Sequence, residues 1–156
     1  MEKELASLYQ KIAEQLDEIV PGKWNEIYFL GEVEEGRRSW SSIFYFKVDN
    51  QIFRCTEIPS KYGVPSEIFE TLLDELNPVL LGFYDCFCRN EQPIWDQIHI
   101  QLLPTGKSNV HFEYDSFAKY DGGQVLREVL WAYHTFGYVP REGTYMHKIL
   151  NKYLEK

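Results

Sequence analysis

Two alternating segments within residues 93–115 constrain the fold of this chain more than any other feature. The apolar set comprises Ile98, Ile100, Leu102, Val110, Phe112 and Tyr114, and the polar set that alternates with it comprises Gln97, His99, Gln101, His111, Glu113 and Asp115. A period of two residues is typical of strands with one buried face. The sequence therefore predicts a β-hairpin whose apolar set faces a core.

The register of this hairpin follows from parity. Both apolar sets must share one face, because a slip of one residue would turn one of them towards water. Only an odd loop length satisfies this condition, and a loop of Pro104, Thr105 and Gly106 suits a type I turn followed by a glycine bulge. The resulting cross-strand pairs are Ile100 with Val110, Ile98 with Phe112 and His99 with His111.

The N-terminal half predicts a helix followed by a strand meander. Apolar residues from Leu5 to Val20 recur at helical spacing, and Pro21 ends that helix. Residues 24–57 then form three aromatic and β-branched runs separated by turn residues, with a tight turn at Asp49 and Asn50. The expected register places Phe46 opposite Phe53 and Tyr45 opposite Arg54.

The remaining segments predict helices on either side of the hairpin. A helix begins near Pro65, and Pro78 is expected to kink or break it. Asp121 is a candidate cap for a further helix that ends at Gly137. The last helix follows Pro140, and its expected buried side comprises Tyr145, Ile149, Leu150, Tyr153 and Leu154. The order α-βββ-α-ββ-α-α predicts an α+β fold, an antiparallel sheet of about five strands with helices mainly on one face, in a single domain spanning residues 1–156.

The charge of the chain indicates the kind of partner. The 156 residues carry a formal charge of −8, and proteins that bind nucleic acid neutralise phosphates with Lys and Arg. We therefore expect a basic protein partner and no direct contact with nucleic acid. The charged start and the absence of a long apolar run favour a cytoplasmic protein without a membrane segment.

The sequence contains no catalytic motif. His99 and His111 could hold a metal with Glu113 or Asp115, since imidazole and carboxylate suit zinc or iron, but two facing histidines on a sheet need have no such role. The three cysteines lack a second pair for a zinc site, so a redox or metal role for Cys86-x-Cys88 stays an alternative to small residues near a helix end. We expect no metal, no cofactor and no catalytic residue.

Several segments resemble the YezG-like immunity protein family in order. They are a short helix ending at Pro21, the segments EIPSKYGVPSEIFETLLDEL and WDQIHIQLLPTGKSNVHFEYD, and the closing LWAYHTFGYVP. The most specific part is the strand that begins at Trp95, joined through a Thr-Gly-Lys turn to a Phe-x-Tyr-Asp strand. This resemblance covers nearly the whole chain.

The resemblance implies an antitoxin of mainly Gram-positive bacteria that binds the C-terminal nuclease domain of a secreted polymorphic toxin. An acidic protein is complementary to the basic cleft that a nuclease presents to DNA. The residues expected to bind the toxin project from the polar side of the hairpin, namely Gln97, His99, Gln101, His111, Glu113 and Asp115. The acidic helix face around Glu67, Glu70, Asp74 and Glu75 is an alternative surface, and a small-ligand or metal-dependent enzyme is the alternative function.

Overall fold

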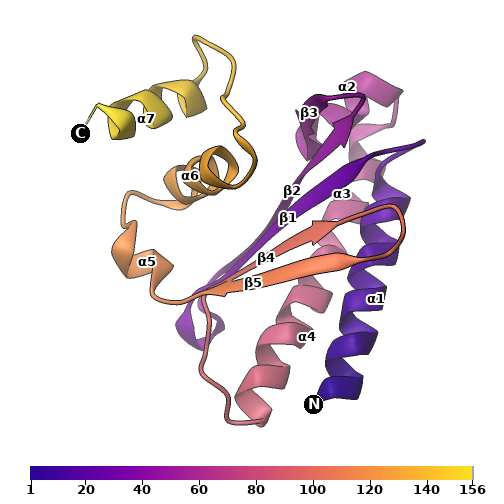
Figure 1. Cartoon of the computed structure of the whole chain (residues 1–156), viewed down its shortest axis with the longest axis vertical. Coiled ribbons are helices and arrows are strands. Elements are labelled where there is room, and N and C mark those ends of the chain that lie inside the picture. Colours follow the sequence, from indigo (N-terminus) through magenta and orange to yellow (C-terminus); the bar gives the residue numbers. More distant parts are fainter. Residues whose placement is uncertain (156) are drawn as a thin grey trace. The chain divides into compact units, whose positions relative to one another are not determined.

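The computed structural model describes residues 1–155, which divide into two compact units, the first ending at Tyr114 and the second beginning at Asp115 (Figure 1). The first unit contains α1 (Glu2–Ile19), β1 (Glu26–Val33), η1 (Glu35–Arg37), β2 (Trp40–Val48), β3 (Gln51–Arg54), η2 (Cys55–Glu57), α2 (Ile58–Tyr62), α3 (Ser66–Asp74), α4 (Leu76–Arg89), β4 (Gln97–Leu102) and β5 (Ser108–Glu113). The second unit contains α5 (Ser116–Lys119), α6 (Gln124–Phe136) and α7 (Tyr145–Leu154).

The first unit is built on one antiparallel sheet of five strands. The strand order is β3-β2-β1-β4-β5, so the meander β1-β2-β3 and the hairpin β4-β5 join where β1 pairs with β4. Both registers predicted for the hairpins are confirmed, including Ile98 opposite Phe112 and Phe46 opposite Phe53. The α+β class and the order of the elements are confirmed as well.

The two hairpin turns have the predicted geometry. The Leu103 N–H donates to the Lys107 carbonyl at 2.9 Å, which leaves a three-residue loop in which Gly106 has a φ of 90°. Asp49 and Asn50 have φ values of 48° and 70°, as a two-residue turn with both residues left-handed requires. In both hairpins, the conformation of the turn is therefore the one required by the register that the apolar alternation predicts.

Helices α1, α3 and α4 lie together along one face of the sheet (Figure 1). Inward residues of the central strands, including Ile27, Phe29, Phe44, Phe46 and Ile98, are fully buried against apolar residues of these helices. A Cβ atom built on Gly31 of β1 would lie 2.4 Å from Leu80 Cδ1, so this glycine permits the close approach of α4.

The helical segment after Pro65 is broken, but earlier than the sequence indicated. Helix α3 ends at Asp74 and α4 starts at Leu76, with Glu75 between them. Pro78 is the third residue of α4, where its missing N–H and fixed φ are tolerated. The short helix α2, which ends at Gly63 with a φ of 69°, was not anticipated.

Two details of the predicted burial and capping are wrong. Tyr114 lies beyond the end of β5 and is 46% exposed, so it does not face the helices. Helix α6 begins at Gln124 with Gly123 at its N-cap, because the chain turns once more after Asp121. The cap at Gly137, which has a φ of 70°, is confirmed.

The buried side of α7 is rotated from the predicted one. Tyr145 and Leu154 are 68% and 47% exposed, whereas Leu150 is 1% exposed. Met146 and Tyr153 pack with Leu150, at spacings of four and three residues, so the apolar stripe starts one residue later than Tyr145. Within residues 1–155 no helix combines the length and apolar character needed to cross a membrane.

Candidate functional site

Five of the six residues proposed for partner binding share one face of the β4-β5 hairpin. Gln97, His99 and Gln101 alternate along β4, while His111 and Glu113 lie opposite on β5. We name these five residues the hairpin polar face. Asp115 does not belong to it, because it opens the second unit with a φ of 60° and its carbonyl accepts from the N–H of Lys119.

The inner part of the hairpin polar face is a hydrogen-bonded chain that runs from Glu32 through Gln97 to His99. Gln97 is 5% exposed, and its Nε2 donates to Glu32 Oε2 on β1 at 2.8 Å. The Gln97 Oε1 lies 3.0 Å from His99 Nε2. Because an amide oxygen only accepts, His99 must donate from Nε2 in this contact. Gln97 therefore has a structural task and does not project into solvent.

A second link ties the same face to Glu26 of β1. Gln101 Nε2 donates to Glu26 Oε2 at 3.1 Å, and Asn109 donates to Gln101 Oε1 at 3.3 Å. The Tyr28 hydroxyl also donates to Glu26, and burial together with this carboxylate raises the pKa of Tyr28. Three strands are thus joined by side-chain bonds on this face.

The outer part of the face is exposed. His111 Nε2 lies 2.7 Å from Glu113 Oε1, and these side chains are 65% and 46% exposed. The rings of His99 and His111 have centroids 5.5 Å apart. Burial, with a smaller effect from His111, lowers the pKa of His99 to about 4, so His99 is neutral at pH 7. Glu113 and His111 are accordingly the groups of this face best placed to contact a partner.

No metal centre is formed by the residues that the structure describes. The two histidines and Glu113 lie on neighbouring strands, but no group of three or more His, Cys, Asp or Glu side chains within residues 1–155 is arranged to hold an ion. A metal-dependent enzyme therefore gains no support from the geometry of this face.

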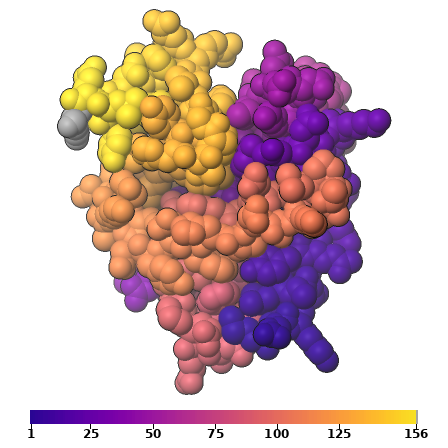
Figure 2. Space-filling model, viewed as in Figure 1, coloured from indigo at the N-terminus to yellow at the C-terminus, as the bar shows by residue number. Residues whose placement is uncertain are grey.

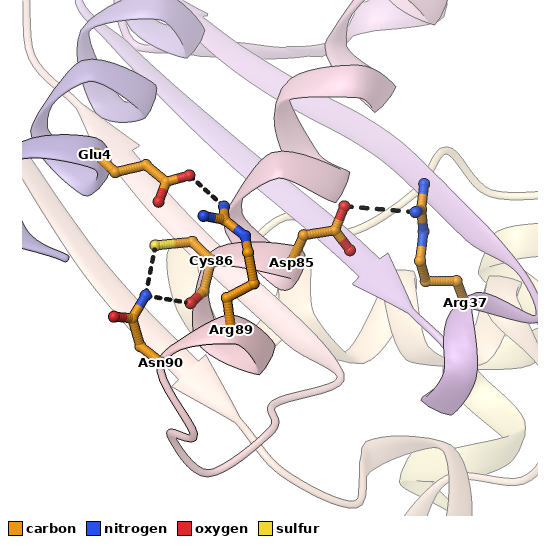
Figure 3. A network of polar contacts seen from close by, with 6 residues as sticks. All are labelled: Glu4, Arg37, Asp85, Cys86, Arg89 and Asn90. Carbon is orange, nitrogen blue, oxygen red and sulfur yellow. Dashed lines mark hydrogen bonds and ion pairs between the residues drawn. The ribbon is translucent and has the colours of Figure 1, made fainter.

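A separate polar cluster joins the start of α1 to the end of α4 (Figure 3). Arg89 pairs with Glu4, and this hydrogen bond lowers the pKa of the Glu4 carboxyl. The Asn90 side chain donates to the Cys86 carbonyl at 2.7 Å. Burial, followed by the effect of Glu4, raises the pKa of the Cys86 thiol. A thiol of that kind is a poor nucleophile, so a structural role is favoured for Cys86, while Cys88 is exposed.

Sequence reasoning missed the β1 partners of the hairpin polar face. Glu32 is 2% exposed and Glu26 accepts from two side chains, yet both lie about seventy residues from the hairpin. Their role depends on the pairing of β1 with β4, which is not encoded locally. The signal that could have found it is Glu32 itself, an acidic residue between Gly31 and Val33 that needs a partner if it is buried.

Comparison with known proteins places this chain in one family. The family model described as "Immunity protein YezG-like" matches residues 5–150. The chain is 31% identical to Immunity protein YezG of Bacillus subtilis (strain 168) over 140 residues, covering 88% of this chain and 91% of that protein. It is 21% identical over 148 residues to the type VII secretion system protein EsaG of Staphylococcus aureus (strain NCTC 8325 / PS 47), covering 95% and 91% of the two chains. The chain therefore belongs to the YezG-like immunity protein family.

Proposed function

We propose that this chain is a non-enzymatic immunity protein that acts in the cytoplasm and neutralises a cognate secreted toxin by binding its C-terminal nuclease domain. Membership of an immunity protein family supports the toxin partner. The observation that carries the nuclease assignment is charge, since a chain of net charge −8 is complementary to a basic DNA-binding cleft.

The hairpin polar face is the surface we assign to this contact, with Asp115 beside it in sequence. Gln97 and Gln101 form hydrogen bonds to β1, and His99 bonds to Gln97, so these inner residues hold β4 in position against β1. Its outer residues His111 and Glu113 are free to exchange their mutual contact for a partner, because both are substantially exposed. Inhibition then follows from occupation of the basic cleft.

Electrostatic steering is the measurable consequence of this assignment. Association with the toxin nuclease domain should be about 10 to 1000 times faster at low salt than for a neutral pair, and added salt should slow it. The test compares Glu113→Lys with the control Glu70→Lys, which makes the same charge change at an exposed position on α3. Binding is measured at two ionic strengths.

The hairpin variant should show slower association and a weaker dependence on salt than the α3 control. Unchanged affinity and salt dependence in Glu113→Lys, with the fold intact, would remove the hairpin polar face from the interface. A larger effect in the α3 variant would assign the contact to the acidic helix face instead.

A further inference from the structure

The outer edge of β5 is available for pairing with another strand. In the described sheet β5 pairs with β4 on one side only, and Figure 1 shows it as the outermost strand. It is six residues long and contains neither Pro nor Gly. The opposite edge, β3, has only four residues and runs directly into η2. Sheet edges that are short, broken or covered do not accept a further strand, so the longer and uninterrupted edge of β5 is the better candidate of the two.

The direction of the free hydrogen-bonding groups follows from the hairpin turn. Leu103 and Lys107 form a hydrogen-bonded pair, and bonded pairs alternate with non-bonded ones along an antiparallel ladder. The backbone groups of Asn109, His111 and Glu113 therefore point to β4. Those of Ser108, Val110 and Phe112 point outwards from the sheet.

A groove of about 500 Å³ lies beside this edge, between α1 and the hairpin. Its apolar walls are formed by Tyr9, Ile12, Ala13, Leu16, Ile100 and Leu102. Ser108, at the start of β5, lies on its border. A second hollow of about 210 Å³ lies next to this groove, at the β4-β5 turn, and shares Ala13 with it. Asp17 and Trp24 also line this second hollow. The hairpin and the neighbouring residues of α1 lie at the molecular surface in Figure 2.

The charge at the rim of the groove indicates its occupant. Glu14 and Asp17 of α1 are exposed at this rim, and the chain as a whole is acidic. A strand added to β5 would direct alternate side chains to the groove side of the sheet. Apolar side chains on that side would enter the groove, and basic ones would reach the two carboxylates.

We infer that β5 receives an extended segment of the toxin domain as a sixth strand, with alternating apolar and basic residues facing the α1 groove. This inference rests on the proposed function and adds the mode of recognition. Main-chain hydrogen bonds supply part of the affinity in such strand addition, and side-chain pockets supply the specificity. The outer residues of the hairpin polar face lie on the same strand, so one partner segment can contact both.

The test uses the full chain and the C-terminal domain of the cognate toxin. Val110→Pro removes an outward N–H without removing a bond to β4, and Ile52→Pro on β3 is the control at the other edge. Ala13→Phe fills the groove from a half-buried helix position without changing charge. Glu14→Lys, Asp17→Lys reverses the rim charge, and Glu2→Lys, Glu18→Lys makes the same charge change elsewhere on α1.

We expect Val110→Pro, Ala13→Phe and the rim reversal each to weaken binding by about tenfold or more, with the controls close to wild type. Amide exchange at Ser108, Val110 and Phe112 should slow when the toxin domain binds. Wild-type affinity in both folded Val110→Pro and folded Ala13→Phe overturns strand addition while the immunity function stands. Failure of the wild-type chain to bind overturns the proposed function itself. Protection of the same amides in the chain alone, with a dimer in sedimentation, would assign the edge to a second copy and also overturn the inference.

Discussion

Gly31 of β1, where α4 approaches the sheet most closely, supplies the sharpest test of the fold. Gly31→Ala adds one methyl group that would lie 2.4 Å from Leu80 Cδ1, 2.9 Å from Ile98 Cγ2 and 3.0 Å from Phe29 Cε2. All three neighbours are 0% exposed, so none can move into solvent. The strand or α4 must shift to accommodate the methyl group.

The expected net destabilisation is about 2.5 kcal/mol. Overpacking a filled core costs about 1 to 3 kcal/mol, and contact with three buried side chains puts Gly31→Ala at the upper end of that range. The loss of glycine flexibility in the unfolded chain returns only about 0.5 kcal/mol. For a chain of this length each 1 kcal/mol shifts Tm by about 2 to 4 °C, so the melting temperature should fall by about 5 to 10 °C.

The assay is urea unfolding followed by circular dichroism, with Gly82→Ala as the control. Gly82 lies in α4, where an added Cβ would meet Leu8 Cδ2 at 3.0 Å, the end of a half-buried flexible side chain. Helix propensity favours Ala over Gly by about 1 kcal/mol there, so Gly82→Ala should be neutral or stabilising. A loss below about 0.5 kcal/mol in Gly31→Ala would refute the close packing of α4 on β1.

Two further predictions concern protonation and turn geometry. Because the pKa of His99 is about 4 in the folded protein and about 6.5 in the unfolded chain, the unfolded state binds the proton first as pH falls. The free energy of unfolding should therefore decrease by about 2 kcal/mol between pH 7 and pH 5. The variant His99→Gln, measured by urea unfolding at both pH values, should lose most of this decrease. An unchanged dependence of stability on pH in the variant would contradict the burial of the His99 ring. Asn50 has a φ of 70°, which glycine adopts more readily, so Asn50→Gly should stabilise the protein by up to about 1 kcal/mol in thermal melts. Gly106 has a φ of 90°, so Gly106→Ala should destabilise the protein by a similar amount. A destabilising Asn50→Gly together with a stabilising Gly106→Ala would contradict the turn assignment.

Elements with a local signal were predictable from sequence. The period of two around Ile98 and Phe112 sufficed for the hairpin because one face had to be buried, and the register then followed from loop parity. Asp49 and Asn50 carried the same information for the second hairpin. Gly137 marked the end of α6 because left-handed C-caps favour glycine.

Features that depend on contacts distant in sequence were not predictable. The break at Glu75 and the rotation of α7 that leaves Tyr145 exposed reflect tertiary packing, which overrides local propensity. For the candidate site, alternation predicted that six polar side chains share a surface, which holds for the five of the hairpin polar face and fails for Asp115. It could not show that Glu32 binds Gln97, since the pairing of β1 with β4 joins residues far apart in the chain.

The most direct test of the immunity function is inhibition by stoichiometric binding. Purified chain is titrated into the C-terminal domain of the cognate toxin, while DNA cleavage and complex formation are followed in parallel. We predict that cleavage falls in proportion to the complex formed and ceases at one equivalent, without added metal beyond that required by the nuclease. Undiminished cleavage in the presence of excess folded chain, or a domain without nuclease activity, would contradict the proposed function.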